Sequence, residues 1–543
     1  MTSARSCPPP EETLLFSRFA EIAERTPDAI AMRYPVGRGG YASITHRDLV
    51  SHVDSCERAL WHAGLRPGMR TVLLAPAGPD CTALLLAIGR IGAVPVLIDP
   101  AIGPRALSRC VAATAAEAFI GVPRAHLARK LLGWPPVKVS ITVGRRWFWR
   151  GHTLAGLLAA DAPKPPAPAE PGGLIAFTSG STGPAKPVEY RAEHLSAQIR
   201  MASAVLDVRV GTPCLITFAP FVVAGPSLGW ETVVPDVDLL RPATADPVKL
   251  IEAIRRFGVE CVFTSPAALE VLSRYCTEHG IVLEQVRKVA CIGASLDPRL
   301  ARRLRRCLHS DAVVHSIYGA TECLPVSVIE SRELLDNAMS SERGHGTCLG
   351  RPVEDNAVRV ITVTDEPIDE WYDGLEVAAG VVGEITVTGP STSESYVGQP
   401  DRTRLAKIRE GDRVVHRVGD LGHLDEQGSL WFHGRKSHRV RTATGDLITE
   451  QVEPIANAVA GVRRSALVGV GATGAQMPVL CLEAESGVDR AAVERAVRAV
   501  LAGHPHTAAI DSLLFHRRFP VDPRHNSKIV REELALWAAR RLR

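Results

Sequence analysis

Residues 174–186 read Leu-Ile-Ala-Phe-Thr-Ser-Gly-Ser-Thr-Gly-Pro-Ala-Lys, which is the strongest local signal in the chain. Its four apolar residues predict a buried strand, which leads directly into a loop of glycine and hydroxyl residues. Glycines let the backbone approach a ligand and let successive N–H groups surround an anion, while hydroxyls and a lysine add donors for phosphate oxygens. The spacing is not that of a Walker A loop. We therefore predict a phosphate site formed by Thr178, Ser179, Gly180, Ser181, Thr182, Gly183 and Lys186.

Strands and helices alternate on both sides of this loop. Before it, the pattern predicts a strand at 70–75, a helix at 80–92 and a short strand at 96–98. After it come predicted helices at 247–257, 267–279 and 298–308, with strands at 261–264, 289–292 and 312–316. Such alternation is typical of α/β proteins with doubly wound parallel sheets, which is the fold class we predict.

The composition excludes several classes of protein. The chain has 543 residues and a formal net charge of +4, far from the basic excess of a nucleic-acid binder. Its twelve cysteines include no CxxC pair, which argues against a zinc cluster and favours buried thiols in a reducing compartment. The longest apolar stretch, 82–98, is interrupted by Arg90 and Pro95 and is too short to cross a membrane. We expect a cytoplasmic chain without a signal peptide or a transmembrane segment.

Lysine is rare, since nine of the 63 basic residues are lysines, so a lysine inside a polar motif stands out. Lys186 ends the phosphate loop, and Lys528 stands in the polar segment 526–531 near the C-terminus. A lysine at such a position can neutralise phosphate charge, although a surface lysine at the start of a helix is the alternative.

Two further segments carry groups that suit a nucleotide. Residues 318–322, Tyr-Gly-Ala-Thr-Glu, are predicted to form a loop after a strand, where open α/β sheets bind ligands. Tyr318 can stack on a base, Thr321 can donate to a phosphate, and the Glu322 carboxylate suits Mg²⁺. Asp420, in the segment 417–422, can accept hydrogen bonds from both hydroxyls of a ribose, a surface aspartate in a turn being the alternative. Together with the phosphate loop, these groups predict a site for a nucleoside triphosphate.

These segments, in this order and spacing, resemble the adenylate-forming superfamily of acyl-CoA synthetases, luciferases and peptide-synthetase adenylation domains. The resemblance covers essentially the whole chain and implies ATP and Mg²⁺ as cofactors. It implies a large domain at 1–433, a hinge at 434–438 and a small, mobile α+β lid domain at 439–543. The catalytic residues that it implies are Lys528 in the lid, Thr321, and Glu322, which would also bind the metal. The nucleotide contacts that it implies are the phosphate loop, Gly293, Ala294, Ser295, Tyr318, Gly319, Ala320, Asp420 and Arg435.

A narrower resemblance links the chain to the OleC-type β-lactone synthetases of olefin and β-lactone pathways. It rests on segments 92–107, 318–326, 435–445, 449–455 and 520–529. Those enzymes use ATP to convert long-chain 2-alkyl-3-hydroxy acids into β-lactones. The resemblance therefore implies an acyl-adenylate, release of pyrophosphate and AMP, and other enzymes of such a pathway as partners.

The chain departs from the broad superfamily at two places. Ala185-Lys186-Pro187 replaces the usual proline–lysine–glycine, and His438 stands where the hinge commonly has aspartate or lysine. Both departures fit the narrower resemblance. A long-chain fatty acyl-CoA ligase or acyl-AMP ligase stays the nearest alternative, and a non-catalytic nucleotide-binding protein is the alternative from another class.

Several histidines and motif matches remain without a role. The sequence identifies no base for closure of the lactone ring. His194, His438 and His525 lie in or near the motif segments, but a histidine in a loop is more often a surface or structural residue. A GxSxG match at 225–229 and a GxGxxG match at 469–474 are predicted to be turns. Residues 145–150, Arg-Arg-Trp-Phe-Trp-Arg, are predicted to be a solvated loop with packed rings, contact with a lipid surface being the alternative.

Overall fold

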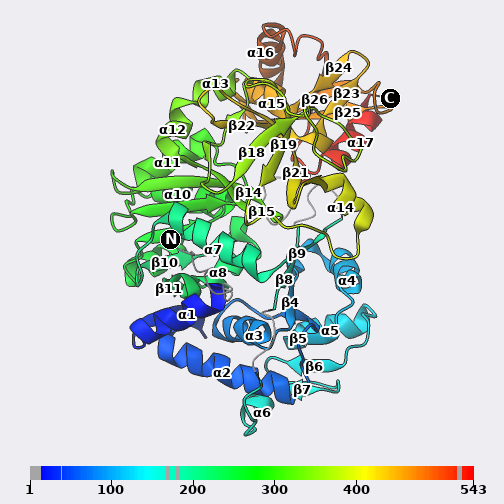
Figure 1. Cartoon of the computed structure of the whole chain (residues 1–543). Helices are drawn as coiled ribbons and strands as arrows, with labels where there is room; N and C mark the ends of the chain where they lie inside the picture. The colour runs from blue at the N-terminus through cyan, green and yellow to red at the C-terminus, as the bar shows by residue number, and fades with distance from the viewer. Residues whose placement is uncertain (1–13, 38, 167–171, 179–183, 522–528, 543) are drawn as a thin grey trace, which may run out of the picture.

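The computed structural model describes residues 14–37, 39–166, 172–178, 184–521 and 529–542. Three larger sheets with their helices occupy most of the chain, and two smaller sheets lie in its last quarter (Figure 1). Within this described part, no helix is long and apolar enough to cross a membrane. The described cysteines are all buried thiols outside any disulfide.

A seven-stranded sheet occupies the first part of the chain. Its strand order is β7-β6-β5-β3-β4-β8-β9, and the pairs are parallel except β8 with β9. The strands are β3 (Arg70–Leu74), β4 (Val94–Leu97), β5 (Ala118–Gly121), β6 (Val139–Thr142), β7 (His152–Thr153), β8 (Leu174–Phe177) and β9 (Pro187–Tyr190). The helices of this part are α2 (His46–His62), α3 (Pro79–Arg90), α4 (Pro104–Ala113), α5 (Pro123–Leu131) and α6 (Leu154–Leu158).

A nine-stranded sheet follows, in the order β17-β15-β14-β13-β12-β10-β11-β1-β2. Its centre is parallel and its two edges are antiparallel. The strands are β1 (Ile30–Val36), β2 (Gly40–Thr45), β10 (Pro213–Ile216), β11 (Glu231–Val233), β12 (Cys261–Thr264), β13 (Lys288–Ile292), β14 (Val313–Ala320), β15 (Cys323–Glu330) and β17 (Arg351–Pro352). Its helices are α1 (Leu14–Arg25), α7 (Ala192–Leu206), α8 (Ala219–Ala224), α9 (Pro247–Arg256), α10 (Pro266–Glu278), α11 (Pro298–Cys307), α12 (Ser331–Asp336) and α13 (Ala338–Glu342).

Local sequence explains why helices of this sheet begin where they do. Asp246 and Asp297 each precede a proline, and each carboxylate accepts a hydrogen bond from the backbone N–H two residues further on. The aspartate satisfies a free donor of the first turn, and proline at the first helical position needs no partner for its nitrogen. The predicted starts of α9 and α11 are therefore confirmed.

The structure corrects the prediction that 318–322 is a loop. Strand β14 continues to Ala320, and Tyr318 pairs with Ser327 of the antiparallel strand β15. The chain turns back at Thr321 and Glu322, so the partner strand extends β14 beyond Ser316. Asp420 is buried inside a strand, so the alternative of a surface aspartate in a turn is wrong.

A third sheet has the order β16-β22-β21-β19-β18, with β20 also paired to β21. Its strands are β16 (Thr347–Cys348), β18 (Ala357–Ile361), β19 (Gly383–Thr388), β20 (Lys407–Glu410), β21 (Arg413–Leu424) and β22 (Leu430–Arg435), and α14 (Pro400–Ala406) precedes β20.

The last quarter of the chain packs around its own core. This part contains β23 (Val440–Thr442), β24 (Gly445–Leu447), β25 (Val462–Val470), β26 (Met477–Ala484), β27 (Ser512–Phe515), α15 (Thr449–Asn457), α16 (Arg490–Ala502) and α17 (Arg531–Arg541). Its core includes the fully buried Val452, Leu467, Leu480 and Val497. The division at 433 and 439 stays a prediction. The two discounted motifs lie in a 3₁₀ turn at Gly225–Leu228 and in the turn between β25 and β26, as predicted.

Candidate active site

One large cavity, of about 1610 Å³, collects the predicted site residues. It lies at the carboxyl ends of β8, β13 and β14, where an open α/β sheet binds its ligands. Its lining includes Thr178, Lys186, Gly293, Ala294, Ser295, Tyr318, Gly319, Ala320, Thr321, Glu322, Asp420 and Arg435. Ser179, Gly180, Ser181, Thr182, Gly183 and Lys528 lie outside the described residues.

The two ends of the phosphate loop are joined by hydrogen bonds. The Thr178 backbone N–H donates to the Lys186 carbonyl oxygen at 3.0 Å, and the Lys186 N–H donates to Thr178 Oγ1 at 2.9 Å. These bonds continue the antiparallel pairing of β8 with β9, which brings the loop back to its starting point. The Lys186 ammonium consequently lies at the cavity wall, where it donates to the Tyr396 hydroxyl at 3.0 Å.

Glu322 is a buried carboxylate with several polar neighbours. Its side chain accepts a hydrogen bond from the Tyr396 hydroxyl at 2.5 Å, and Lys186 Nζ lies 3.5 Å away. Burial alone would raise the pKa of Glu322. The fields of His416 and Lys186 and the hydrogen bond from Tyr396 outweigh burial and lower the pKa to about 2. The carboxylate is therefore ionised at neutral pH and can face a cation from the cavity wall.

Sequence reasoning missed three buried residues that lie behind the cavity lining and act on Glu322: Tyr396, Lys407 and His416. Lys407 is buried, and its ammonium donates to the Ser393 carbonyl and to Ser393 Oγ. Burial lowers the pKa of Lys407 to about 8. Burial and the charge of Lys407 lower the pKa of His416 to about 3, so this imidazole is neutral at pH 7. Lys407 is one of nine lysines, and that rarity was the signal that could have found it.

Tyr318, Asp420 and Arg435 form a second polar group. Asp420 and Arg435 are register partners on the adjacent strands β21 and β22, which places their side chains together. Arg435 contacts one Asp420 oxygen at 2.9 Å, and the Tyr318 hydroxyl donates to the other at 2.6 Å. A carboxylate fixed in this way presents an acceptor next to an aromatic ring, which is the pairing that a nucleoside needs.

Residues of the last quarter of the chain also line the cavity: His438, Thr449, Glu450, Glu453, Ile529 and Arg531. Arg531 donates to both oxygens of Glu453, at 2.6 and 2.9 Å. Burial and the charge of Glu453 raise the pKa of Glu450 to about 7. Burial and the charge of Arg531 lower the pKa of His438 to about 3.

The two described candidate histidines differ in position. His438 lies at the cavity, whereas His194 is buried in the first turn of α7. There its Nδ1 accepts a hydrogen bond from the Arg191 backbone N–H at 3.1 Å, which caps the helix. His194 therefore has a structural role, and His525 lies outside the described residues.

Beyond the polar groups, the cavity wall is apolar. Side chains from β3, α3, α7, α8 and the loop after β11 line it, among them Leu73, Leu85, Val205, Val223, Phe221 and Leu239. Apolar side chains predominate in this region, so it fits a long hydrocarbon chain.

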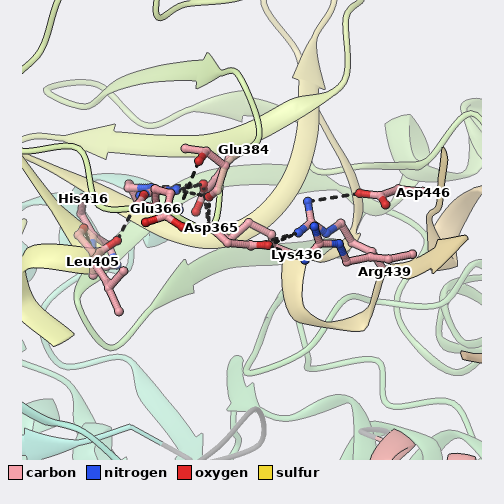
Figure 2. Close-up of polar contacts among 12 residues, drawn as sticks. Asp365, Glu366, Glu384, Leu405, His416, Lys436, Arg439 and Asp446 are labelled. Atoms are coloured by element: carbon pink, nitrogen blue, oxygen red, sulfur yellow. Dashed lines mark hydrogen bonds and ion pairs between the residues drawn. The ribbon is translucent and has the colours of Figure 1, made fainter. Parts of the chain in front are cut away.

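Ion pairs join the predicted hinge to the third sheet (Figure 2). Lys436 contacts the buried Glu384 of β19 at 2.9 Å, and Arg417 of β21 contacts the same carboxylate. Arg439 contacts Asp365, which follows β18, at 2.8 Å and Asp446 at 3.3 Å. These contacts hold residues 436–446 against the third sheet in this conformation.

Comparison with known proteins agrees with this geometry. Residues 19–397 match the family of AMP-binding enzymes. The chain is 46% identical to an olefin beta-lactone synthetase of Stenotrophomonas maltophilia, over 97% of this chain and 98% of that protein. It is 47% identical to an olefin beta-lactone synthetase of Xanthomonas campestris, over 95% and 96% of the two chains.

A solved structure supports the fold independently. An amide bond synthetase of Marinactinospora thermotolerans superposes with a TM-score of 0.79 over 96% of this chain and 99% of its own, at 22% identity. The predicted α/β fold class and the predicted resemblance are thus confirmed. The chain belongs to the AMP-binding enzymes of the adenylate-forming superfamily and, within it, to the family of the olefin beta-lactone synthetases.

Proposed function

We propose that this chain is an ATP-dependent β-lactone synthetase that acts on a long-chain 2-alkyl-3-hydroxy acid. The observation that carries the proposal is the 46–47% identity to two olefin beta-lactone synthetases over nearly the full length. The cavity supports it, because polar groups suited to a nucleotide adjoin an apolar wall suited to alkyl chains. Other enzymes of an olefin or β-lactone pathway would then supply the acid and consume the lactone.

In the first half-reaction, the substrate carboxylate attacks the α-phosphorus of ATP and pyrophosphate leaves. Both reactants are anionic, so the protein must place positive charge and donors where negative charge builds. Lys186 and Thr178 at the phosphate loop and Lys528 in the lid would do this, and Asp420 would hold the ribose. Mg²⁺ beside a nucleotide is commonly held by one or two carboxylates together with phosphates and water. Glu322, an ionised carboxylate at the cavity, fits this role, and Mg²⁺ bound there would neutralise phosphate charge.

In the second half-reaction, the substrate's own hydroxyl attacks the acyl carbon and AMP leaves. Because the nucleophile is tethered, its effective concentration can reach about 10⁵ M or more, which offsets the strain of a four-membered ring. The apolar wall would keep water from the adenylate. His438 lies nearby, but a pKa of about 3 makes it a poor proton acceptor, and we assign it no catalytic role.

The two half-reactions would be separated by rotation of residues 439–543 about a hinge at 434–438. Gly434 has φ +119°, and a Cβ there would lie 2.2 Å from Thr449 Oγ1, so this end of the hinge requires glycine. In the present conformation, Ile529 and Arg531, which follow Lys528 in the sequence, line the cavity.

The test is product analysis without any thiol. The protein is incubated with ATP, Mg²⁺ and a 2-alkyl-3-hydroxy acid, and the product is identified by NMR, since heating can convert a β-lactone into an olefin. We expect β-lactone, AMP and pyrophosphate. Release of pyrophosphate with lactone absent, and thioester formed once coenzyme A is added, would instead establish an acyl-CoA ligase.

A further inference from the structure

We propose that a surface at the end of α5 binds the face of an anionic phospholipid bilayer. This α5 surface comprises Lys130, Leu131, Leu132, Arg145, Arg146, Trp147, Phe148 and Arg150. It combines exposed apolar side chains with unpaired positive charge. Other residues of α5 form part of the cavity wall.

The apolar part of this surface is unusually exposed. Leu131 is 76% exposed, Phe148 68%, Trp147 49% and Leu132 41%. The two segments meet, since the Lys130 ammonium lies 5.4 Å from the centre of the Phe148 ring. Single exposed apolar residues are common, but adjoining leucine, tryptophan and phenylalanine side chains among basic residues are typical of segments that enter the headgroup region of a membrane.

Acidic residues are absent from the sequence segment that carries this surface, although Lys138 in it pairs with Glu117. Residues 118–160 contain no aspartate or glutamate and seven basic residues: Arg124, Arg129, Lys130, Lys138, Arg145, Arg146 and Arg150. Within the described part of the chain, the exposed Arg145, Arg146 and Arg150 form no ion pair with a carboxylate. Uncompensated basic groups beside exposed aromatic rings complement the negative surface of an anionic bilayer.

The loop is anchored in a way that presents these rings. Trp149 is buried, stacks on His126 of α5 with ring centres 5.2 Å apart, and donates from Nε1 to Thr142 Oγ1 at 2.9 Å. The prediction of a solvated loop with packed rings in 145–150 is confirmed: the Trp147 and Phe148 rings lie 5.5 and 5.4 Å from the Trp149 ring, and both side chains stay exposed on their outer faces. Because the Trp149 ring is fixed, the two rings packed against it are held at the surface.

Helix α5 links this surface to the cavity. His126 stacks on Trp149 of the loop, while Arg124, Ala125 and Ala128 of the same helix line the cavity. A protein bound to a bilayer through the α5 surface would hold its apolar cavity close to the lipid that dissolves long-chain acids. The binding itself does not depend on the proposed reaction and can be tested without substrate.

The test is sedimentation of the full chain with vesicles of phosphatidylcholine alone or of equal parts phosphatidylcholine and phosphatidylglycerol. We expect binding to the anionic vesicles, weakened by salt, and little binding to the neutral ones. Each arginine lost should weaken binding about fivefold, so Arg145→Gln/Arg146→Gln should bind roughly 25-fold more weakly. Trp147→Ser/Phe148→Ser should remove the fraction of binding that survives high salt.

Two controls keep the result specific. Arg209→Gln/Arg463→Gln removes two exposed arginines elsewhere, with side chains 84% and 63% exposed, and should bind like the wild type. All variants should turn over a short-chain acid dissolved in water at the wild-type rate. Wild-type protein that stays in the supernatant with anionic vesicles overturns the proposal. A dimer in lipid-free sedimentation velocity that Trp147→Ser/Phe148→Ser abolishes, without vesicle binding, would assign the surface to a second copy.

Discussion

At the scale of single residues, the site divides into groups that sequence motifs reveal and groups that only packing brings together. Lys186, Glu322 and Asp420 lie in recognisable motifs, and the structure places all three at one cavity. Tyr396 lies 74 residues from Glu322 and belongs to no motif that we considered, yet its hydroxyl contacts both Glu322 and Lys186. Such a contact depends on tertiary packing, which local spacing in a sequence does not encode.

Tyr396→Phe tests whether this contact serves the reaction. The change removes the donor to Glu322 and the acceptor for Lys186 and keeps the ring. Hydrogen bonds to charged groups of this kind stabilise by about 1.5–3 kcal/mol, so we expect pyrophosphate release to fall at least about tenfold. Tyr372→Phe, at a 58% exposed tyrosine, is the matched control. A Tyr396→Phe rate equal to that of the control would exclude this role.

Lys528→Ala should keep the fold and lose adenylation. Removing one donor that stabilises charge in a transition state typically lowers the rate about 10²–10³-fold. Lys249→Ala, at a lysine whose side chain is 44% exposed, serves as the control for loss of a lysine. Pyrophosphate release is the measurement, and a near-normal rate for Lys528→Ala would count against the assignment of this lysine.

Glu450 gives a pH dependence of stability with a definite sign. Its pKa is raised to about 7 in the folded chain, against about 4.3 in an unfolded one, so the folded chain binds the extra proton between these values. Stability from this group is complete below pH 4 and decreases as the pH rises toward 7. Glu450→Gln should therefore be the more stable form at pH 8, by on the order of 3–4 kcal/mol, and lose that advantage at pH 4.

Urea unfolding of Glu450→Gln and wild type at both pH values provides the measurement. Glu485→Gln, at an exposed glutamate, controls for the lost charge. A difference between Glu450→Gln and wild type that stays constant with pH would contradict a protonated Glu450.

At the scale of elements, the predicted boundaries are right where a local sequence signal begins a helix. They are wrong where pairing with another strand lengthens a strand. Aspartate–proline pairs marked the starts of α9 and α11 correctly. The predicted strand at 312–316 stops four residues short of the end of β14, because β15 folds back and pairs with Tyr318 and Ala320. A strand's length depends on its partner, and one sequence segment contains no record of that partner.

The ion pairs of the hinge segment belong to this scale as well. Asp365 contacts Arg439 at 2.8 Å and Arg441 at 2.9 Å. Asp365→Asn should weaken both contacts, and because Asp365 is 47% exposed the effect should be modest, about fivefold faster hydrogen exchange in residues 439–447. Asp28→Asn, at an exposed ion pair with Arg47, is the control. Unchanged exchange in this segment would show that these pairs do not hold it.

At the scale of the whole molecule, the alternation of strands and helices predicted the fold class, and a parallel sheet brings the ends of successive strands to one edge. Loops far apart in sequence thereby meet at one cavity. The apolar wall of that cavity could not be predicted, since its residues come from five separate elements and look like ordinary core in the sequence.

The central claim is that this chain activates a carboxylate and then lets the same molecule close upon itself. An acid carrying ¹⁸O in both carboxyl oxygens tests this directly, by mass spectrometry of AMP and lactone after one turnover. If the carboxylate attacks the α-phosphorus and the hydroxyl then displaces AMP, one label leaves in AMP and one stays in the lactone. Unlabelled AMP together with a doubly labelled lactone would mean that the hydroxyl is activated instead, and would contradict the account.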